Sequence, residues 1–175
     1  MKPAPPEPVK LFVAAIVGPD APVDDARARC VERFGPIDHE SPRIAFTFTD
    51  YYADEMGANL ARLFWSFERT IDPSAIVEAK LATNAIEQAL AKSGRRTVNL
   101  DAGYLDTCKV VLATAKGAGQ KVYLRDGIWA DLVLTFVKGR VRFFEWGFPD
   151  FKSGAYDKTL LKIRELFKAQ RRTPR

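Results

Sequence analysis

The feature that most constrains the fold is a series of alternating apolar segments separated by tight-turn dipeptides. Ile128–Val137 alternates along its length, with Ile128, Ala130, Leu132, Leu134 and Phe136 expected on one face, as in a half-buried strand. Asp126-Gly127 precedes this segment and Lys138-Gly139 follows it, and such pairs favour hairpin turns. Strands are therefore expected at 121–124 and 141–146 as well. Because hairpins join antiparallel neighbours, the sequence predicts an antiparallel sheet.

The first hundred residues predict a different pattern, in which strands alternate with helices. Asp72-Pro73 is a good helix start, because Asp suits the N-cap and Pro the first helical position. The order of elements matches a ferredoxin-like unit. We expect strands at 9–17, 43–49 and 96–100, a turn at 101–103, and helices at 22–34, after residue 72 and at 155–169. Segment 60–70 fits both helix and strand spacing, and its aromatic residues favour strand; segment 109–113 fits either. The predicted class is α+β: a mostly antiparallel sheet with a ferredoxin-like βαββαβ start, added hairpin strands and a C-terminal helix, the helices lying on one face.

The chain is expected to form one domain. Its 175 residues suffice for a single hydrophobic core, and an aromatic content of 11% is typical of a folded chain. Residues 1–8 include four prolines and predict a flexible leader, 9–169 a single α+β domain, and 170–175 a basic tail. No apolar run is long enough for a membrane span, and the leader does not resemble a secretion signal. We therefore expect a cytoplasmic protein without membrane association; its oligomeric state is left open.

The net charge of +5 arises at the C-terminal end. From Lys162 onward there are six cations and one anion, so the rest of the chain is neutral overall. A basic stripe across a domain suggests nucleic acid, whereas a basic terminus is more typical of a solvated end. A nucleic-acid-binding module that uses the basic C-terminal helix is therefore the alternative function, and nucleic acid is not the expected partner.

Several kinds of site can be excluded. A single histidine, His39, and two separated cysteines, Cys30 and Cys108, are too few for structural zinc. The glycine pair at 117–119 lacks the spacing and the Mg²⁺-binding hydroxyl of a phosphate loop, and a strand rather than a helix is expected after it. We therefore expect no tight binding or hydrolysis of GTP. No catalytic motif identifies a reaction, so the cofactor is unknown and enzymatic activity is left open.

Three polar clusters beside predicted strand ends form the candidate site. Aromatic rings next to carboxylates suit a site that stacks a ring and accepts hydrogen bonds, and the carboxylates could also hold Mg²⁺. The same residue types serve as turn formers and helix caps, which is the simpler reading of each cluster alone. Lys109 is expected to pair with an anionic group of the ligand. The candidate ligand-binding residues are Asp50, Tyr51, Tyr52, Asn99, Asp101, Tyr104, Lys109 and Asp150. Together they predict a small ligand, anionic or nucleotide-like.

A family resemblance rests on several strings that occur in a fixed order. They are FTDYYADEMG, SFERTIDP, KLATNAIE, VNLDAGYLD, KVVLATAK, KVYLRDGIWADLVL and WGFPDFKS. The chain from about Val9 to Tyr156 resembles the bacterial family catalogued as domain of unknown function 4416. The family pattern contains Asp50, Tyr51, Asn99, Asp101, Gly103, Tyr104, Lys109 and Asp150. Some members carry the label "GTP-binding protein", but the phosphate loop and the Asn-Lys-x-Asp guanine motif that GTP sites use do not occur in this sequence.

Overall fold

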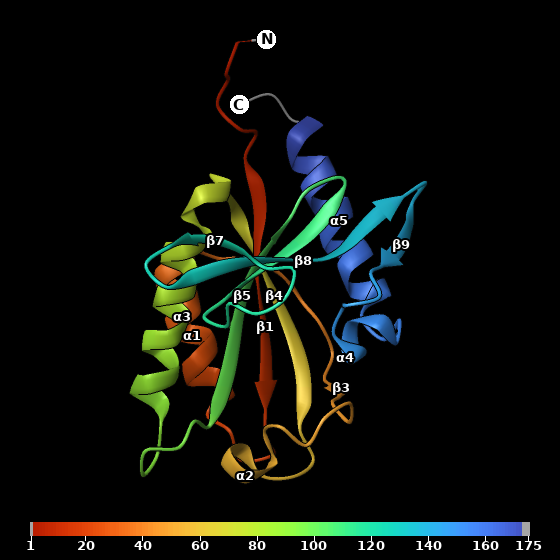
Figure 1. Cartoon of the computed structure of the whole chain (residues 1–175). Helices are drawn as coiled ribbons and strands as arrows, with labels where there is room; N and C mark the ends of the chain where they lie inside the picture. The colour runs from red at the N-terminus through yellow and green to blue at the C-terminus, as the bar shows by residue number, and fades with distance from the viewer. Residues whose placement is uncertain (1, 173–175) are drawn as a thin grey trace.

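The computed structural model describes residues 2–172, which form a nine-stranded sheet flanked by helices (Figure 1). The path through the sheet is β2-β4-β1-β5-β6-β8-β7, with β3 also paired to β4 and β9 to β8, and every pairing is antiparallel. The strands are β1 (Val9–Val17), β2 (Ile37–Glu40), β3 (Ile44–Ala45), β4 (Ala61–Ile71), β5 (Val98–Leu105), β6 (Lys109–Thr114), β7 (Val122–Arg125), β8 (Ile128–Val137) and β9 (Arg140–Phe143). The helices are α1 (Val23–Phe34), α2 (Ala53–Met56), η1 (Pro73–Ala75), α3 (Ile76–Leu90), α4 (Pro149–Lys152) and α5 (Asp157–Arg172). The predicted α+β class, antiparallel sheet and C-terminal helix are confirmed.

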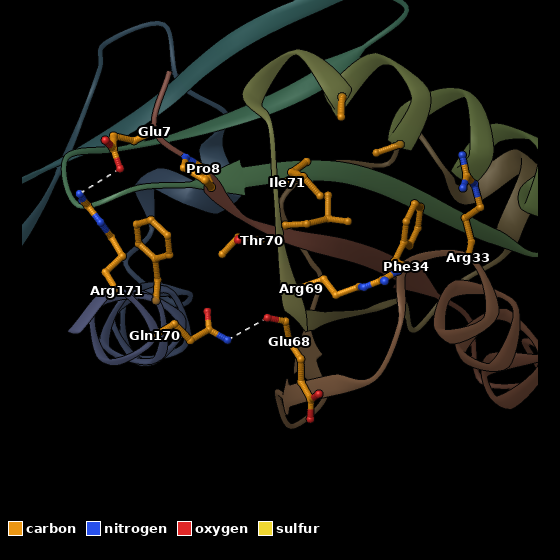
Figure 2. A pocket seen from close by; sticks show the side chains of 14 residues that line it. Glu7, Pro8, Arg33, Phe34, Glu68, Arg69, Thr70, Ile71, Gln170 and Arg171 are labelled. Atoms are coloured by element: carbon orange, nitrogen blue, oxygen red, sulfur yellow. Dashed lines mark hydrogen bonds and ion pairs between the residues drawn. The ribbon is translucent and has the colours of Figure 1, made fainter. Parts of the chain in front are cut away.

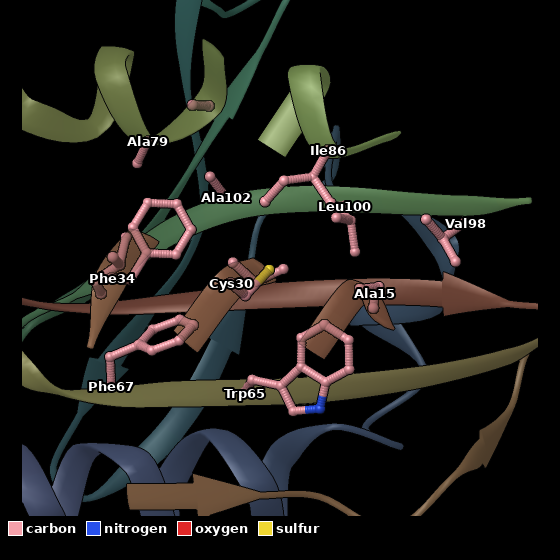
Figure 3. Packing of buried hydrophobic residues seen from close by; sticks show 14 of the residues in the cluster. Ala15, Cys30, Phe34, Trp65, Phe67, Ala79, Ile86, Val98, Leu100 and Ala102 are labelled. Carbon is pink, nitrogen blue, oxygen red and sulfur yellow. The ribbon is translucent and has the colours of Figure 1, made fainter. Parts of the chain in front are cut away.

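Helices α1 and α3 cover one face of the sheet. Because side chains alternate along a strand, every second residue of β1 points toward these helices. Figure 3 shows Cys30 and Phe34 of α1 packed between Trp65 and Phe67 of β4 and the small residues of the neighbouring strands. This layer is the largest of three hydrophobic clusters in the described part of the chain.

The opposite face of the sheet packs against α5, which corrects the expectation that the helices lie on one face. Phe12 and Phe64 point to this side, where they meet the apolar stripe of α5, including Leu160 and Ile163. The stripe was predicted correctly, but an amphipathic pattern does not say which face of a sheet a helix covers. The two layers bury both sides of β1 along its whole length and of β4 over residues 62–67.

The sheet divides between β5 and β6, and the strands beyond this fork run in a different direction from β1. β5 pairs with β1 along its whole length, but with β6 only through Gly103–Leu105. At the point of division a Cβ on Gly103 would lie 2.6 Å from the Phe12 ring, so only glycine fits there. Beyond the fork β8 and β7 run across the direction of β1 (Figure 1). The residues expected to form a turn at 101–103 are therefore strand, because β1 holds them extended.

Two predicted strands are shorter than expected. The strand predicted at 141–146 ends at Phe143, as β9. The alternating segment 43–49 forms a strand only at Ile44–Ala45, where it pairs with β4. Phe46 donates one more backbone hydrogen bond, to the Leu60 carbonyl at 2.9 Å, and the chain then leaves the sheet. Its aromatic residues, Phe46 and Phe48, instead line a cavity.

Candidate functional site

A cavity of about 520 Å³ lies at the fork of the sheet. It is bounded by the segment after β3, by α3, β5, β6, β8 and by α4. Residues far apart in the sequence meet there: Tyr51 and Tyr52 from the first predicted cluster, Asn99 and Asp101 from the second, and Asp150 from the third. The volume is in the range of small-molecule sites.

Arg62 of β4 forms the floor of the cavity. Its side chain is 5% exposed and bridges two carboxylates: Nη1 lies 3.0 Å from Asp101 Oδ2, and Nη2 lies 3.1 Å from Asp150 Oδ2. The Tyr156 hydroxyl also donates to Asp150 Oδ2, at 3.2 Å. A buried charge is tolerated only when it is paired and hydrogen-bonded, so these residues form one interdependent unit.

Side chains of α3 reach the cavity through the fork. The backbone of Leu100 has no β6 partner, so its N–H donates to Glu87 Oε1 at 2.5 Å and its carbonyl accepts from Lys80 Nζ at 2.9 Å. Lys80 Nζ also lies 3.7 Å from Asp101 Oδ1. Burial raises the pKa of the Glu87 carboxyl above its usual value, an effect that the charge of Lys80 opposes. Burial acts in the same direction on Asp101, but Lys80 and Arg62 outweigh it and hold its pKa below the usual value.

Aromatic rings form one wall of the cavity. The Phe46 ring packs edge-to-face against Phe48 and Tyr52, with centroids 6.1 and 5.9 Å away. Two arginines make cation–π contacts with this wall. The Arg62 guanidinium lies 5.2 Å from the centroid of the Phe46 ring, and the Arg96 guanidinium lies 5.8 Å from the centroid of the Tyr52 ring. Phe148 and Phe151 contribute rings from the α4 segment.

A loop between β6 and β7 carries Lys116 to the cavity. The Lys116 ammonium lies 4.0 Å from the centroid of the exposed Tyr51 ring, and its hydrogen bond to Tyr51 lowers the pKa of that hydroxyl. The Lys116 N–H donates to Thr114 Oγ1 at 3.1 Å. Gly117 packs so closely on Trp129 that an added Cβ would lie 2.4 Å from the ring. The loop backbone is therefore fixed beside the site.

The structure brings five of the eight predicted site residues together and leaves three elsewhere. Asp50 lies in an exposed turn, where its carbonyl accepts from the Ala53 N–H at 2.9 Å. Tyr104 points to the helix-covered face of the sheet, against the core beneath α1 and α3. Lys109 pairs with Asp106 at the far end of β6. The cavity lining as described contains none of these three side chains.

The charged residues on the inner side of the cavity were not singled out from the sequence. Arg62 interrupts an apolar strand, and Lys80 and Glu87 lie seven residues apart beside the apolar face of α3. A charged residue inside an apolar strand or beside the apolar face of a helix indicates a buried ion pair, because Lys, Arg and Glu are almost never buried unless they are paired. Asp131 of β8 is the other such case, with a side chain 2% exposed.

A second hollow, of about 1160 Å³, lies where β1 begins and β4 ends, beside the C-terminal end of α5 (Figure 2). Two bonds join residues of its lining: Arg171 pairs with Glu7 at 3.5 Å, and Gln170 donates to the Glu68 carbonyl at 2.9 Å. None of the predicted site residues lines it, so the cavity at the fork remains the candidate site.

Comparison with known proteins gives the family. The family model described as "Domain of unknown function (DUF4416)" matches residues 7–167. The chain belongs to this family. No match was found among the curated proteins or among the solved structures, so the ferredoxin-like start stays a prediction. Within residues 2–172 of this DUF4416 protein, no helix is long and apolar enough to span a membrane. Nor does this part of the chain hold three His, Cys, Asp or Glu side chains grouped around a common metal position.

Proposed function

We propose that this domain binds a small organic molecule with a planar ring in the cavity at the fork of the sheet. The observation that carries the proposal is that Tyr52, Asp101 and Asp150, from three separate segments, line one cavity of about 520 Å³. Chance clusters of turn residues would face solvent at scattered positions. Convergent polar groups in an aromatic-walled cavity are typical of ligand sites.

The wall is suited to a ring because its aromatic groups are held in place before any ligand arrives. Phe46 and Tyr52 contact each other, and each lies against an arginine. Phe148 lines the cavity with its side chain while remaining 41% exposed. An exposed ring beside a cavity gains contact area when a planar ligand stacks on it.

The charged floor supports the same proposal. Replacing a buried ion-pair network by apolar residues is often neutral or stabilising, so folding alone gives little reason to keep Arg62 between Asp101 and Asp150. Groups of this kind, with ionisation shifted by burial and partners, occur preferentially at functional sites. Here they present fixed hydrogen-bonding atoms to the cavity at little reorganisation cost on binding.

The test is a thermal-shift screen of the purified protein against ring-bearing metabolites, with and without Mg²⁺. A specific ligand at a hundredfold excess over its Kd should stabilise the fold by about 2.7 kcal/mol. Phe148→Ala should abolish the shift while leaving the unliganded protein's Tm near that of wild type. The matched control is Trp146→Ala, since Trp146 is 53% exposed, stacks on Phe144 and does not line the cavity.

The control variant should keep the full ligand-induced shift. Two results would overturn the proposal. One is the absence of stabilisation by any ring-bearing compound. The other is equal stabilisation of wild type and the Phe148→Ala protein, which would place the ligand elsewhere.

A further inference from the structure

We infer that the ligand has the chemistry of a nucleoside monophosphate, with a neutral ring deep in the cavity and one anionic group at the mouth beside Lys116. This inference rests on the proposed function and specifies the ligand class and its orientation. It follows from which charges in the cavity are already paired and which hydrogen-bonding groups of the lining remain accessible.

The deep charges cancel one another. Each carboxylate that lines the cavity has a cation within 4.0 Å: Asp101 and Asp150 have Arg62, Glu87 has Arg96, and Asp131 has Lys121. A charged group inserted among these pairs would lose its hydration without gaining an unpaired partner. The inner part of the ligand is therefore neutral.

Lys116 differs from the other cations in the lining. Within residues 2–172, Arg62, Lys80 and Arg96 each have a carboxylate within 4.0 Å, and Lys116 has none. Its ammonium is held over the Tyr51 ring, in a loop fixed by Thr114 and by the packing of Gly117 on Trp129. A positioned cation with no acidic partner favours an anion at this point.

Hydrogen-bonding groups of both kinds are accessible in the lining. The Asp101 carboxylate, with its side chain 24% exposed, is an acceptor, and the Arg96 guanidinium, with its side chain 29% exposed, is a donor. A neutral ring that offers both an acceptor and a donor fits, and the bases of nucleotides offer both.

The mouth suits one phosphate rather than three. Triphosphate sites use a cradle of backbone N–H groups at a helix N-terminus together with a lysine and a metal-binding hydroxyl. The segment Gly117–Gln120 leads into strand β7, so the loop that carries Lys116 is not followed by a helix. A monophosphate carries about 1.5 to 2 negative charges near pH 7 and each added phosphate brings more, so a single ammonium offsets most of the charge only for the monophosphate.

Isothermal titration calorimetry tests the inference with the 5′-monophosphates of adenosine, guanosine, cytidine and uridine, the matching nucleosides, and the matching triphosphates. At least one monophosphate should bind, with its nucleoside about tenfold weaker, as expected for a hydrogen bond to a charged group. The triphosphate should bind no more tightly than the monophosphate. Lys116→Ala should lower monophosphate affinity to that of the nucleoside and leave nucleoside binding unchanged.

Lys158→Ala is the matched control, because Lys158 is an exposed cation of α5 that does not line the cavity. It should leave all affinities unchanged. The inference is overturned if monophosphate and nucleoside bind equally, if Lys116→Ala has no effect, or if the triphosphate binds tenfold more tightly. Each of these results leaves the proposed function standing. If only a ring compound of another class binds, the inference is overturned and the proposed function again stands. Failure of every ring compound to bind removes both.

Discussion

Replacing Arg62 by methionine tests whether the floor of the cavity is one interdependent unit. The substitution keeps most of the side-chain length and removes the charge that Asp101 and Asp150 share. Removing one partner of a buried ion pair costs about 3–5 kcal/mol, because the remaining charge is left uncompensated. For a chain of 175 residues this corresponds to a fall in Tm of roughly 8–14 °C, from an unfolding entropy of about 2.1 cal/mol/K per residue.

The control is Arg27→Met, which removes an ion pair of similar length on the surface. Arg27 Nε lies 2.8 Å from Glu40 Oε2, but the two side chains are 42% and 38% exposed. Exposed pairs contribute about 0–1 kcal/mol, so the Tm of this variant should fall by no more than about 3 °C. Urea unfolding followed by circular dichroism gives the free energy of unfolding for each protein.

A compensating variant separates loss of charge balance from loss of packing. Arg62→Met combined with Asp101→Asn and Asp150→Asn removes the uncompensated carboxylates and should recover at least about 1 kcal/mol relative to Arg62→Met alone. The reasoning is refuted if Arg62→Met is destabilised no more than Arg27→Met. It is also refuted if the two asparagines lower the stability of the Arg62→Met protein further.

Three further outcomes are expected. Burial raises the pKa of the Cys30 thiol to about 12, so its thiolate fraction at pH 8 is about 10⁻⁴; mass spectrometry after iodoacetamide should show rapid labelling of exposed Cys108 and labelling of Cys30 only in denaturant. Hydrogen bonds from Arg96 lower the pKa of Glu55 below its usual 4.5. The stability that this pair contributes is therefore present above that pKa and lost as the pH falls through the folded value, and the difference between wild type and Glu55→Gln in urea should shrink from pH 7 to pH 3. Finally, deleting residues 171–175 should not change RNA retention at about 50 mM salt, because none is expected; retention that the deletion abolishes would establish the nucleic-acid alternative.

The elements with strong local patterns were predictable from the sequence. Ile128–Val137 forms β8 with the predicted bounds. The hairpin turns occur at 126–127 and 138–139, the glycine-containing pairs that predict them. The chain becomes helical after Asp72 as predicted, with the Asp72 side chain accepting from the Ser74 N–H, but its first turn is the 3₁₀ helix η1 and α3 begins at Ile76. In each case the deciding interactions lie within a few residues, so the local sequence contains the information.

The parts that failed depend on contacts between distant segments. Asp101-Ala102-Gly103 has the composition of a turn, but pairing with β1 keeps it in β5. The sequence predicts Lys109 as the cation of the site and does not single out Lys116. Lys109 is paired by Asp106, three residues before it, while the fork carries Lys116 to the cavity. Composition therefore predicted five residues that line the candidate cavity, and only the fold distinguishes which cation lies beside it.

The polarity of the cavity follows from the division of the sheet. Once β6 leaves β5, the N–H and carbonyl of Leu100 lack strand partners, and burying them unpaired would be costly. Glu87 and Lys80 supply those hydrogen bonds from α3, which brings a carboxylate and an ammonium beneath the surface. Their charges must be balanced in turn, and Asp101 with its partner Arg62 completes the balance. The opening that a ligand would enter and the charged groups that would meet it thus have one structural cause. A chain that closed the fork with a full β5–β6 ladder would need neither Lys80 nor Glu87, and would have no cavity.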